Sequence, residues 1–405
     1  MFAGSKREIL NIKNDNALSM GKIKEIAFID KNSKEIIRFA QSLIRINSSY
    51  SNETAVAFLI KDKLNEYGIK SMLAGKKADR KNLIAEVKGK GKTFLLSGHL
   101  DTTTCGNEKS WKFPPYSGTI SNGKLFGVGA LDMKGGISSI VYSFISLAQN
   151  SELKGNVKLV LAGQEMGADH EGIREVMKDC IGAKGCIIAE PGPQNTIDIG
   201  GRGVYRFELL VKGKQAQSAY PEKGSNAIMN AVELISALKK AKFRFKKHKM
   251  FRPFAMNFDM INGGKALNII PGECTLGVDC RLTYDQTKEN ILSAVKKAIL
   301  KLKKKERFFD AEINELAYIR PYYVNKNDKT VRLAVKSCEY VTGNKAVLRV
   351  GGAACDGNLL AEKGIPNVTF GPVGGNVLSE NEFVYTKSLV DAAKIYALTT
   401  KEFLK

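Results

Sequence analysis

Apolar positions recur along the chain in two patterns, one helical and one typical of buried strands. Between Lys34 and Gly68 they recur at helical spacing, which predicts two helices separated by a break at Asn47. Short, continuously apolar runs follow, each ending in a loop rich in glycine or proline, and these predict strands. The clearest runs are Thr93–Ser97, Asn156–Ala162, Gly185–Ala189 and Asn367–Phe370.

Strands that are apolar along their whole length belong in a sheet covered by helices on both faces. The pattern therefore predicts an α/β fold. In such sheets ligands bind beyond the carboxyl ends of the strands. The loops that follow the four runs are where we expect chemistry.

A different pattern occupies residues 199–318. Strands are predicted over Val204–Val211 and Thr275–Leu282, and amphipathic helices over 226–242 and 287–305, which indicates a smaller inserted α+β domain. Residues 1–29 lack clear periodicity and are predicted to form an N-terminal extension. The main domain is then expected in two parts, residues 30–198 and 319–405.

The net charge of +22 suggests polyanion binding, but the kind of basic residue argues against it. Of 63 basic residues only 14 are Arg, the residue that most often recognises phosphates and nucleic-acid bases. The Lys runs lie at predicted helix ends. We therefore expect no nucleic-acid partner. No apolar run is long enough to span a membrane, and the seven Cys show no paired spacing, which favours a reduced, cytoplasmic protein.

Candidate metal ligands follow the predicted strands. His99 follows the first strand, and the carboxylate of Asp101, two residues later, could fix the orientation of its ring. Asp132 lies in a turn bounded by glycines, where a carboxylate could bridge two metal ions. Glu165 follows the second strand, and Glu190 follows the third.

Each carboxylate taken alone could equally be a helix cap or a turn residue. Together, one imidazole and three carboxylates converging after buried strands require a cation to offset their charge. Mixed imidazole and carboxylate ligands suit zinc, with cobalt or manganese as alternatives.

These motifs resemble a known family. The segments HLD, GVGALDMKGG, QE and AEP occur in the order and at the intervals found in the metal-dependent deacylases and exopeptidases. That family includes acetylornithine deacetylase, succinyl-diaminopimelate desuccinylase, aminoacylase and glutamate carboxypeptidase. The resemblance covers about residues 33–405. Within this range, segments in 211–228, 268–281, 351–357 and 370–384 also resemble the family.

The resemblance implies a zinc-peptidase-like mixed sheet and a lid domain that often mediates homodimers. It also implies a two-metal site in which Asp132 bridges, His99 and Glu190 hold one ion, and Glu165 and a late His hold the other. The implied reaction is hydrolysis of an amide in an N-acyl amino acid or short peptide, with a Glu as general base and a lid His at the oxyanion.

The sequence departs from that family at three positions. Gln164 occupies the position of the general base, Gln217 that of the lid His, and Leu378 that of the late metal His. An amide cannot take up a proton near neutral pH, and Leu cannot bind a metal. We therefore expect one zinc ion rather than two. Conceivable substitutes are Glu380 or Asn376 as ligands, and Glu171 or His170 as base, although His170 reads more simply as a loop or cap residue.

Two hypotheses follow. The first is a metallohydrolase whose activity is weakened, altered or lost, and the second is a non-catalytic protein on the same fold that binds a small molecule. In either case Arg281 and the glycines Gly351 and Gly352 could bind a substrate carboxylate. A salt bridge between Arg281 and Asp279 is the alternative for that arginine.

Overall fold

The computed structural model describes residues 23–49, 51–150, 153–167 and 170–405. The predicted extension over 1–29 lies mostly outside these residues. Its last part, from Lys24, forms a helix that packs against the carboxy-terminal helix, where buried Glu25 accepts from Lys401 at 2.7 Å.

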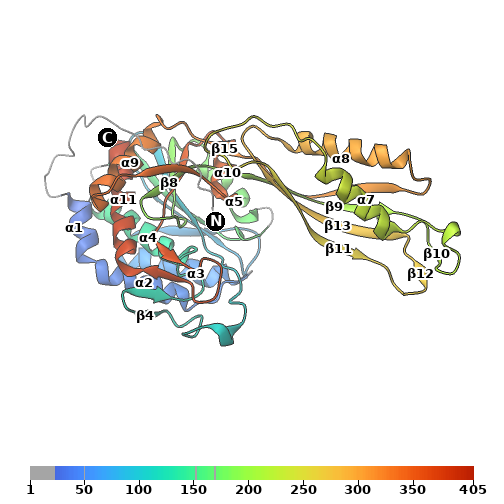
Figure 1. The fold of residues 1–405 in the computed structure, drawn as a ribbon. Helices are drawn as coiled ribbons and strands as arrows, with labels where there is room; N and C mark the ends of the chain where they lie inside the picture. The colour runs from blue at the N-terminus through green and yellow to red at the C-terminus, as the bar shows by residue number, and fades with distance from the viewer. Residues whose placement is uncertain (1–22, 50, 151–152, 168–169) are drawn as a thin grey trace. The chain divides into compact units, whose positions relative to one another are not determined.

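The chain divides into two compact units (Figure 1). Unit 1 contains the described residues up to Gly200, together with Tyr323–Gly351 and Cys355–Lys405. Unit 2 contains Gly201–Tyr322 and Gly352–Ala354. The sequence predicts an insert at 199–318. Its start lies two residues before, and its end four residues before, those of the continuous part of unit 2, Gly201–Tyr322.

Unit 1 is built on a nine-stranded mixed sheet in the order β1-β2-β6-β3-β7-β17-β8-β15, with β16 paired to β8. Its centre is parallel, because β3 runs parallel to both β6 and β7, and β17 parallel to β7. In contrast, β2 is antiparallel to β6, and β8 is antiparallel to β17. The mixed α/β fold is confirmed. The strands are β1 (Ser71–Ala74), β2 (Asn82–Val87), β3 (Thr93–His99), β6 (Asn156–Ala162), β7 (Gly185–Ile188), β8 (Thr196–Gly201), β15 (Tyr322–Tyr323), β16 (Val347–Gly351) and β17 (Asn367–Thr369).

Helices cover this sheet because its central strands are apolar on both faces. Helices α4 and α11 pack on β3 and on each other, with α1 and α2 against them, whereas α5, α6 and α10 contribute to a separate apolar cluster with side chains from β3, β6 and β7. The helices of unit 1 are α1 (Lys24–Lys31), α2 (Ser33–Ile44), α3 (Glu53–Glu66), α4 (Lys134–Asn150), α5 (Glu171–Glu175), α6 (Met177–Cys180), α9 (Lys329–Thr342), α10 (Asp356–Glu362) and α11 (Thr386–Leu404).

A small antiparallel sheet in unit 1 joins segments that are far apart in the sequence. Its order is β18-β19-β5-β4, and the β19–β5 pairing places Phe383 opposite Phe126. The strands are β4 (Thr119–Ser121), β5 (Lys124–Phe126), β18 (Gly374–Gly375) and β19 (Phe383–Tyr385). This pairing brings the residue before β19 next to the glycine-rich turn after β5.

Unit 2 is an antiparallel sheet in the order β11-β13-β9-β14, with two helices on one face. Side chains of β9 alternate between buried and half-buried, and the buried set packs against α7 and α8. A short β10–β12 ladder lies beside it. The elements are β9 (Gly203–Lys212), β10 (Ala216–Gln217), α7 (Ala227–Lys239), β11 (Ala255–Gly263), β12 (Ile269–Ile270), β13 (Glu273–Leu282), α8 (Lys288–Lys303) and β14 (Asp310–Ile319).

None of the described helices is long and apolar enough to cross a membrane. All seven Cys lie in the described residues, and each is a free thiol.

A buried carboxyl at the start of α3 makes the stability of the protein depend on pH. Glu53 is fully buried, and burial raises its pKa from 4.5 to about 7. Above pH 7 the folded protein must hold this group charged, whereas at pH 5 it is largely protonated. We expect Glu53→Gln to raise the free energy of unfolding by about 2 kcal/mol more at pH 8 than at pH 5.

Urea denaturation at the two pH values measures this difference. Glu66→Gln, at the exposed end of the same helix, is the control and should show little pH dependence. An equal effect of Glu53→Gln at both pH values would contradict the assignment.

Candidate metal centre

Three adjacent parallel strands bring most of the predicted ligands to one edge of the main sheet. His99 is the last residue of β3, the loop after β6 carries Glu165, and Glu190 lies two residues after the end of β7. Because parallel strands end at the same edge, residues separated by up to 91 positions in the sequence become neighbours.

His99 is buried and held by carboxylates on both ring nitrogens. Its Nε2 lies 3.0 Å from Asp132 Oδ1, and its Nδ1 lies 3.0 Å from the Asp101 carbonyl and 3.5 Å from Asp101 Oδ1. Burial opposes protonation of the ring, but the contacts with Asp101 and Asp132 raise the pKa of His99 well above its usual value. Asp101 thus contacts Nδ1 through its backbone carbonyl and, at the longer distance, its carboxylate; the orienting role of this carboxylate stays a prediction.

Asp101 also fixes the neighbouring loop. Its carboxylate accepts the backbone N–H groups of Glu165 at 3.1 Å and of Met166 at 2.9 Å. Burial works against ionisation of this carboxyl, but these bonds and the contact with His99 hold the pKa of Asp101 below its usual range. One carboxylate therefore contacts His99 and positions the backbone of Glu165.

The turn that carries Asp132 is held by Glu382, the residue before β19. Glu382 accepts three backbone N–H groups, from Gly129 at 3.2 Å, Leu131 at 2.7 Å and Asp132 at 2.8 Å. The side chain of Glu382 therefore braces the turn before α4, because the small sheet brings the two segments together.

Burial and neighbouring carboxylates raise the pKa of both Glu165 and Glu190. Burial, followed by the charge of Glu190, raises the pKa of Glu165 well above its usual value. Burial and the charge of Asp132 raise the pKa of Glu190 to about 8. Glu190 Oε1 is buried and has no hydrogen-bond partner among the described residues.

Two further groups lie beside Glu165, although the sequence analysis did not predict either as a metal ligand. His170 and Asp356 are both buried; the imidazole Nδ1 lies 2.9 Å from Asp356 Oδ1 and 3.8 Å from Glu165 Oε1. His170 stands at the N-cap of α5, as a cap residue would, but its side chain makes no cap hydrogen bond. The sequence feature that could have indicated His170 is its position in the same loop as Glu165. Its partner Asp356 lies 186 residues away in the sequence.

This donor set fits a divalent cation. Four carboxylates, of Asp132, Glu165, Glu190 and Asp356, face two imidazoles, and two buried oxygens, Glu190 Oε1 and Asp356 Oδ2, lack a hydrogen-bond partner among the described residues. Buried carboxylates in such numbers require positive charge. Among the described residues, no three of these groups are arranged as a metal site. The two imidazoles are instead paired with carboxylates, His99 with Asp132 and His170 with Asp356.

Gln164, predicted at the base position, has its amide between Glu171 and Arg80. In the amide orientation that satisfies both neighbours, the side-chain nitrogen donates to Glu171 Oε2 at 2.5 Å and the side-chain oxygen accepts from Arg80. Glu171 also accepts from Lys77 at 2.6 Å, so the suggested substitute base is tied into a surface ion pair.

The remaining predicted residues are not members of these pairs. Leu378 is 49% exposed and Gln217 is exposed on β10 of unit 2. Arg281, on β13, donates to Asp279 Oδ1 at 2.6 Å, so the alternative salt bridge is formed; Arg206 holds the other oxygen at 2.9 Å. Gly351 ends β16 in unit 1, and Gly352 begins the short segment assigned to unit 2. A role for these three residues in substrate binding stays a prediction.

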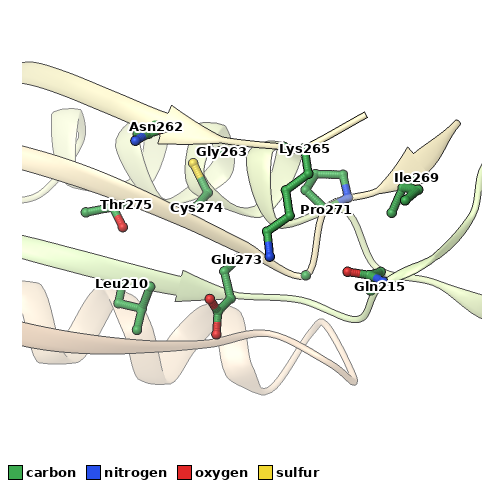
Figure 2. A pocket seen from close by; sticks show the side chains of 12 residues that line it. Leu210, Gln215, Asn262, Gly263, Lys265, Ile269, Pro271, Glu273, Cys274 and Thr275 are labelled. Carbon is green, nitrogen blue, oxygen red and sulfur yellow. The ribbon is translucent and has the colours of Figure 1, made fainter. Parts of the chain in front are cut away.

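Unit 2 contains a separate pocket of about 460 Å³. Figure 2 shows Leu210, Glu273 and Thr275 on the sheet strands, with Gln215 and Ile269 from the side of the β10–β12 ladder. The lining residues include one carboxylate and no imidazole. This pocket therefore lacks the donor set found at the edge of the main sheet.

The comparison with known families decides the classification. The model of peptidase family M20/M25/M40 matches residues 95–402, which contain every predicted metal ligand. The chain belongs to this family. The predicted resemblance to metal-dependent deacylases and exopeptidases is thereby confirmed.

Curated relatives within the M20/M25/M40 family match nearly the whole chain. A succinyl-diaminopimelate desuccinylase from Pseudoalteromonas translucida is 27% identical over 377 residues, covering 90% of this chain and 97% of its own length. One from Pelagibacter ubique is 28% identical over 383 residues, covering 91% and 98%.

Solved structures share the fold. Aminopeptidase PepT from Bacillus cereus superposes with a TM-score of 0.76 at 19% identity, covering 92% of this chain and 99% of its own. A dinuclear metal-binding M20 peptidase from Bacillus subtilis gives 0.73 at 18% identity, covering 93% and 99%. At these identities the likeness establishes the fold alone.

The brace formed by Glu382 generates a prediction for this M20 chain. Glu382→Gln replaces one accepting oxygen by a donor that opposes the backbone N–H groups, which loosens the turn that carries Asp132. We expect zinc affinity, measured by competition with a chromogenic chelator, to fall about 10- to 100-fold.

Glu362→Gln, at the exposed end of α10, is the matched control and should leave zinc affinity unchanged. Unchanged zinc affinity in folded Glu382→Gln would show that the brace does not position Asp132.

Proposed function

We propose that this chain is a zinc-dependent amidohydrolase of the M20/M25/M40 family whose turnover is strongly reduced. The observation that carries the proposal is the approach of His99 Nε2 to Asp132 Oδ1, at 3.0 Å, together with the buried Oε1 of Glu190, which has no hydrogen-bond partner among the described residues. Two ligand atoms on one tetrahedral zinc lie about 3.4 Å apart, close to this separation.

The side chains of the chain would act around the ion in defined ways. His99, Asp132 and Glu190 bind it, Asp101 holds the tautomer of His99, and Glu382 positions Asp132. A bound zinc supplies Lewis-acid polarisation of the substrate carbonyl and lowers the pKa of the attacking water.

Proton transfer is the step that the chain supports poorly. Gln164 stands where the family has a Glu, and its amide is held by Glu171 and Arg80. General base catalysis contributes about 10²- to 10⁴-fold, and an oxyanion donor such as the lid His about 10²- to 10³-fold. With Gln164 and Gln217 at those positions, we expect slow hydrolysis.

The proposed substrates are N-acyl amino acids or short peptides. The curated relatives are desuccinylases of an N-succinyl amino acid by name, and several structural relatives are named peptidases. The residues proposed for the carboxylate of such a substrate are the ones that the sequence predicts, Arg281, Gly351 and Gly352.

The proposed setting is a cytoplasmic homodimer that forms through unit 2. Free thiols support a reducing compartment. The strand β11 ends one edge of the unit 2 sheet and exposes Met260 and Ile261, which suits pairing with a second copy.

Metal analysis tests the first part of the proposal. Protein purified without chelator should contain at least one zinc per chain by plasma mass spectrometry. His99→Asn should remove it, whereas His248→Asn, in unit 2, should retain it. A wild-type chain that neither contains nor takes up zinc at micromolar concentration would refute the proposal.

Restoring the missing residues tests the second part. The double variant Gln164→Glu, Leu378→His should raise kcat/KM on at least one N-acetyl, N-succinyl or dipeptide substrate about 10²-fold or more, with zinc, cobalt or manganese supplied. Gln149→Glu, on an exposed position of α4, is the matched control and should have no effect.

The two hypotheses separate in the same assay. Slow wild-type hydrolysis that disappears in Glu165→Ala supports the enzyme. Ligand binding without hydrolysis, both before and after restoration, would instead support the non-catalytic binding protein.

A further inference from the structure

One half of the candidate site lacks the nitrogen ligand that the sequence comparison leads one to expect. Leu378 stands at that position, is aliphatic and is 49% exposed. Glu165 would therefore have only oxygen donors around it if no other imidazole reached its side of the site.

His170 places an imidazole beside Glu165. Its Nδ1 lies 3.8 Å from Glu165 Oε1 and 2.9 Å from Asp356 Oδ1. These separations lie on either side of the roughly 3.4 Å expected between two ligand atoms of one tetrahedral zinc. His170 Nδ1 is thus the atom that these two carboxylates share as a neighbour.

The fold of unit 1 holds these donors in place. Glu165 and His170 belong to the same loop after β6, and His170 adopts a left-handed backbone conformation, φ 53°, just before α5. Asp356 is the first residue of α10, which packs against α5. The imidazole and the carboxylate are therefore brought together by two packed helices.

Asp356 retains capacity to bind a cation. Its Oδ1 is engaged by His170, whereas its Oδ2 is buried without a hydrogen-bond partner among the described residues. A purely structural hydrogen bond to His170 would not require a second buried and unsatisfied oxygen, which is unfavourable by itself.

We propose that His170 and Asp356 complete a second zinc position with Glu165, in place of the histidine that Leu378 replaces. The inference rests on the proposed function, since it assumes that His99, Asp132 and Glu190 hold the first ion. It predicts two zinc-binding events per chain rather than one.

The three histidines of the chain allow a direct test. In protein labelled with nitrogen-15 in histidine, zinc titration followed by imidazole NMR should shift the signals of both His99 and His170. His248, in unit 2, is the internal control and should not move. His99→Asn and His248→Asn identify their own signals, so the signal of His170 follows by exclusion and needs no variant of that residue.

The outcomes distinguish the inference from the function on which it rests. A shift of His99 alone, even in excess zinc, would overturn the second position and leave the proposed function intact. No shift of either residue would refute both.

A second measurement tests Asp356. By calorimetry, Asp356→Asn should weaken the second zinc-binding event about tenfold or more and leave the first unchanged. Glu362→Gln, at the exposed end of α10, is the matched control and should alter neither event. Two unchanged events in folded Asp356→Asn would remove Asp356 from the proposed ligand set.

Discussion

The accumulation of negative charge at the carboxyl edge of the main sheet is the constraint on which this site depends. Asp132, Glu165, Glu190 and Asp356 face only two imidazoles, and burial with mutual repulsion raises the pKa of both Glu165 and Glu190. Carboxylates held this way are unfavourable unless they share protons or bind a cation. The surrounding hydrogen bonds hold them in place: Asp101 contacts His99 and holds the loop of Glu165, and Glu382 holds the turn of Asp132.

Under the proposed function, the three departures from the family affect different parts of the chemistry. Gln164 would remove a proton acceptor, and its amide lies between Glu171 and Arg80. Leu378 would remove a ligand, for which we propose His170 as the substitute. Gln217 belongs to unit 2. On this account the chain keeps the means to bind a metal more completely than the means to transfer a proton.

Much of the fold could be predicted from the sequence, because the parallel strands at its centre are apolar along their length. The predicted runs at 93–97, 156–162 and 185–189 correspond to β3, β6 and β7, and their loops carry the predicted ligands. Contacts between distant segments could not be predicted in this way. His170 meets Asp356 across 186 residues, and Glu382 meets Asp132 across 250, and neither pair shares a local motif.

Crystallographic location of zinc by anomalous scattering tests the central claim most directly. In crystals grown with zinc, the account predicts a strong anomalous peak about 2.0–2.2 Å from His99 Nε2 and from oxygens of Asp132 and Glu190. A crystal without a peak there, in which His99 still binds Asp132 directly at saturating zinc, would contradict it.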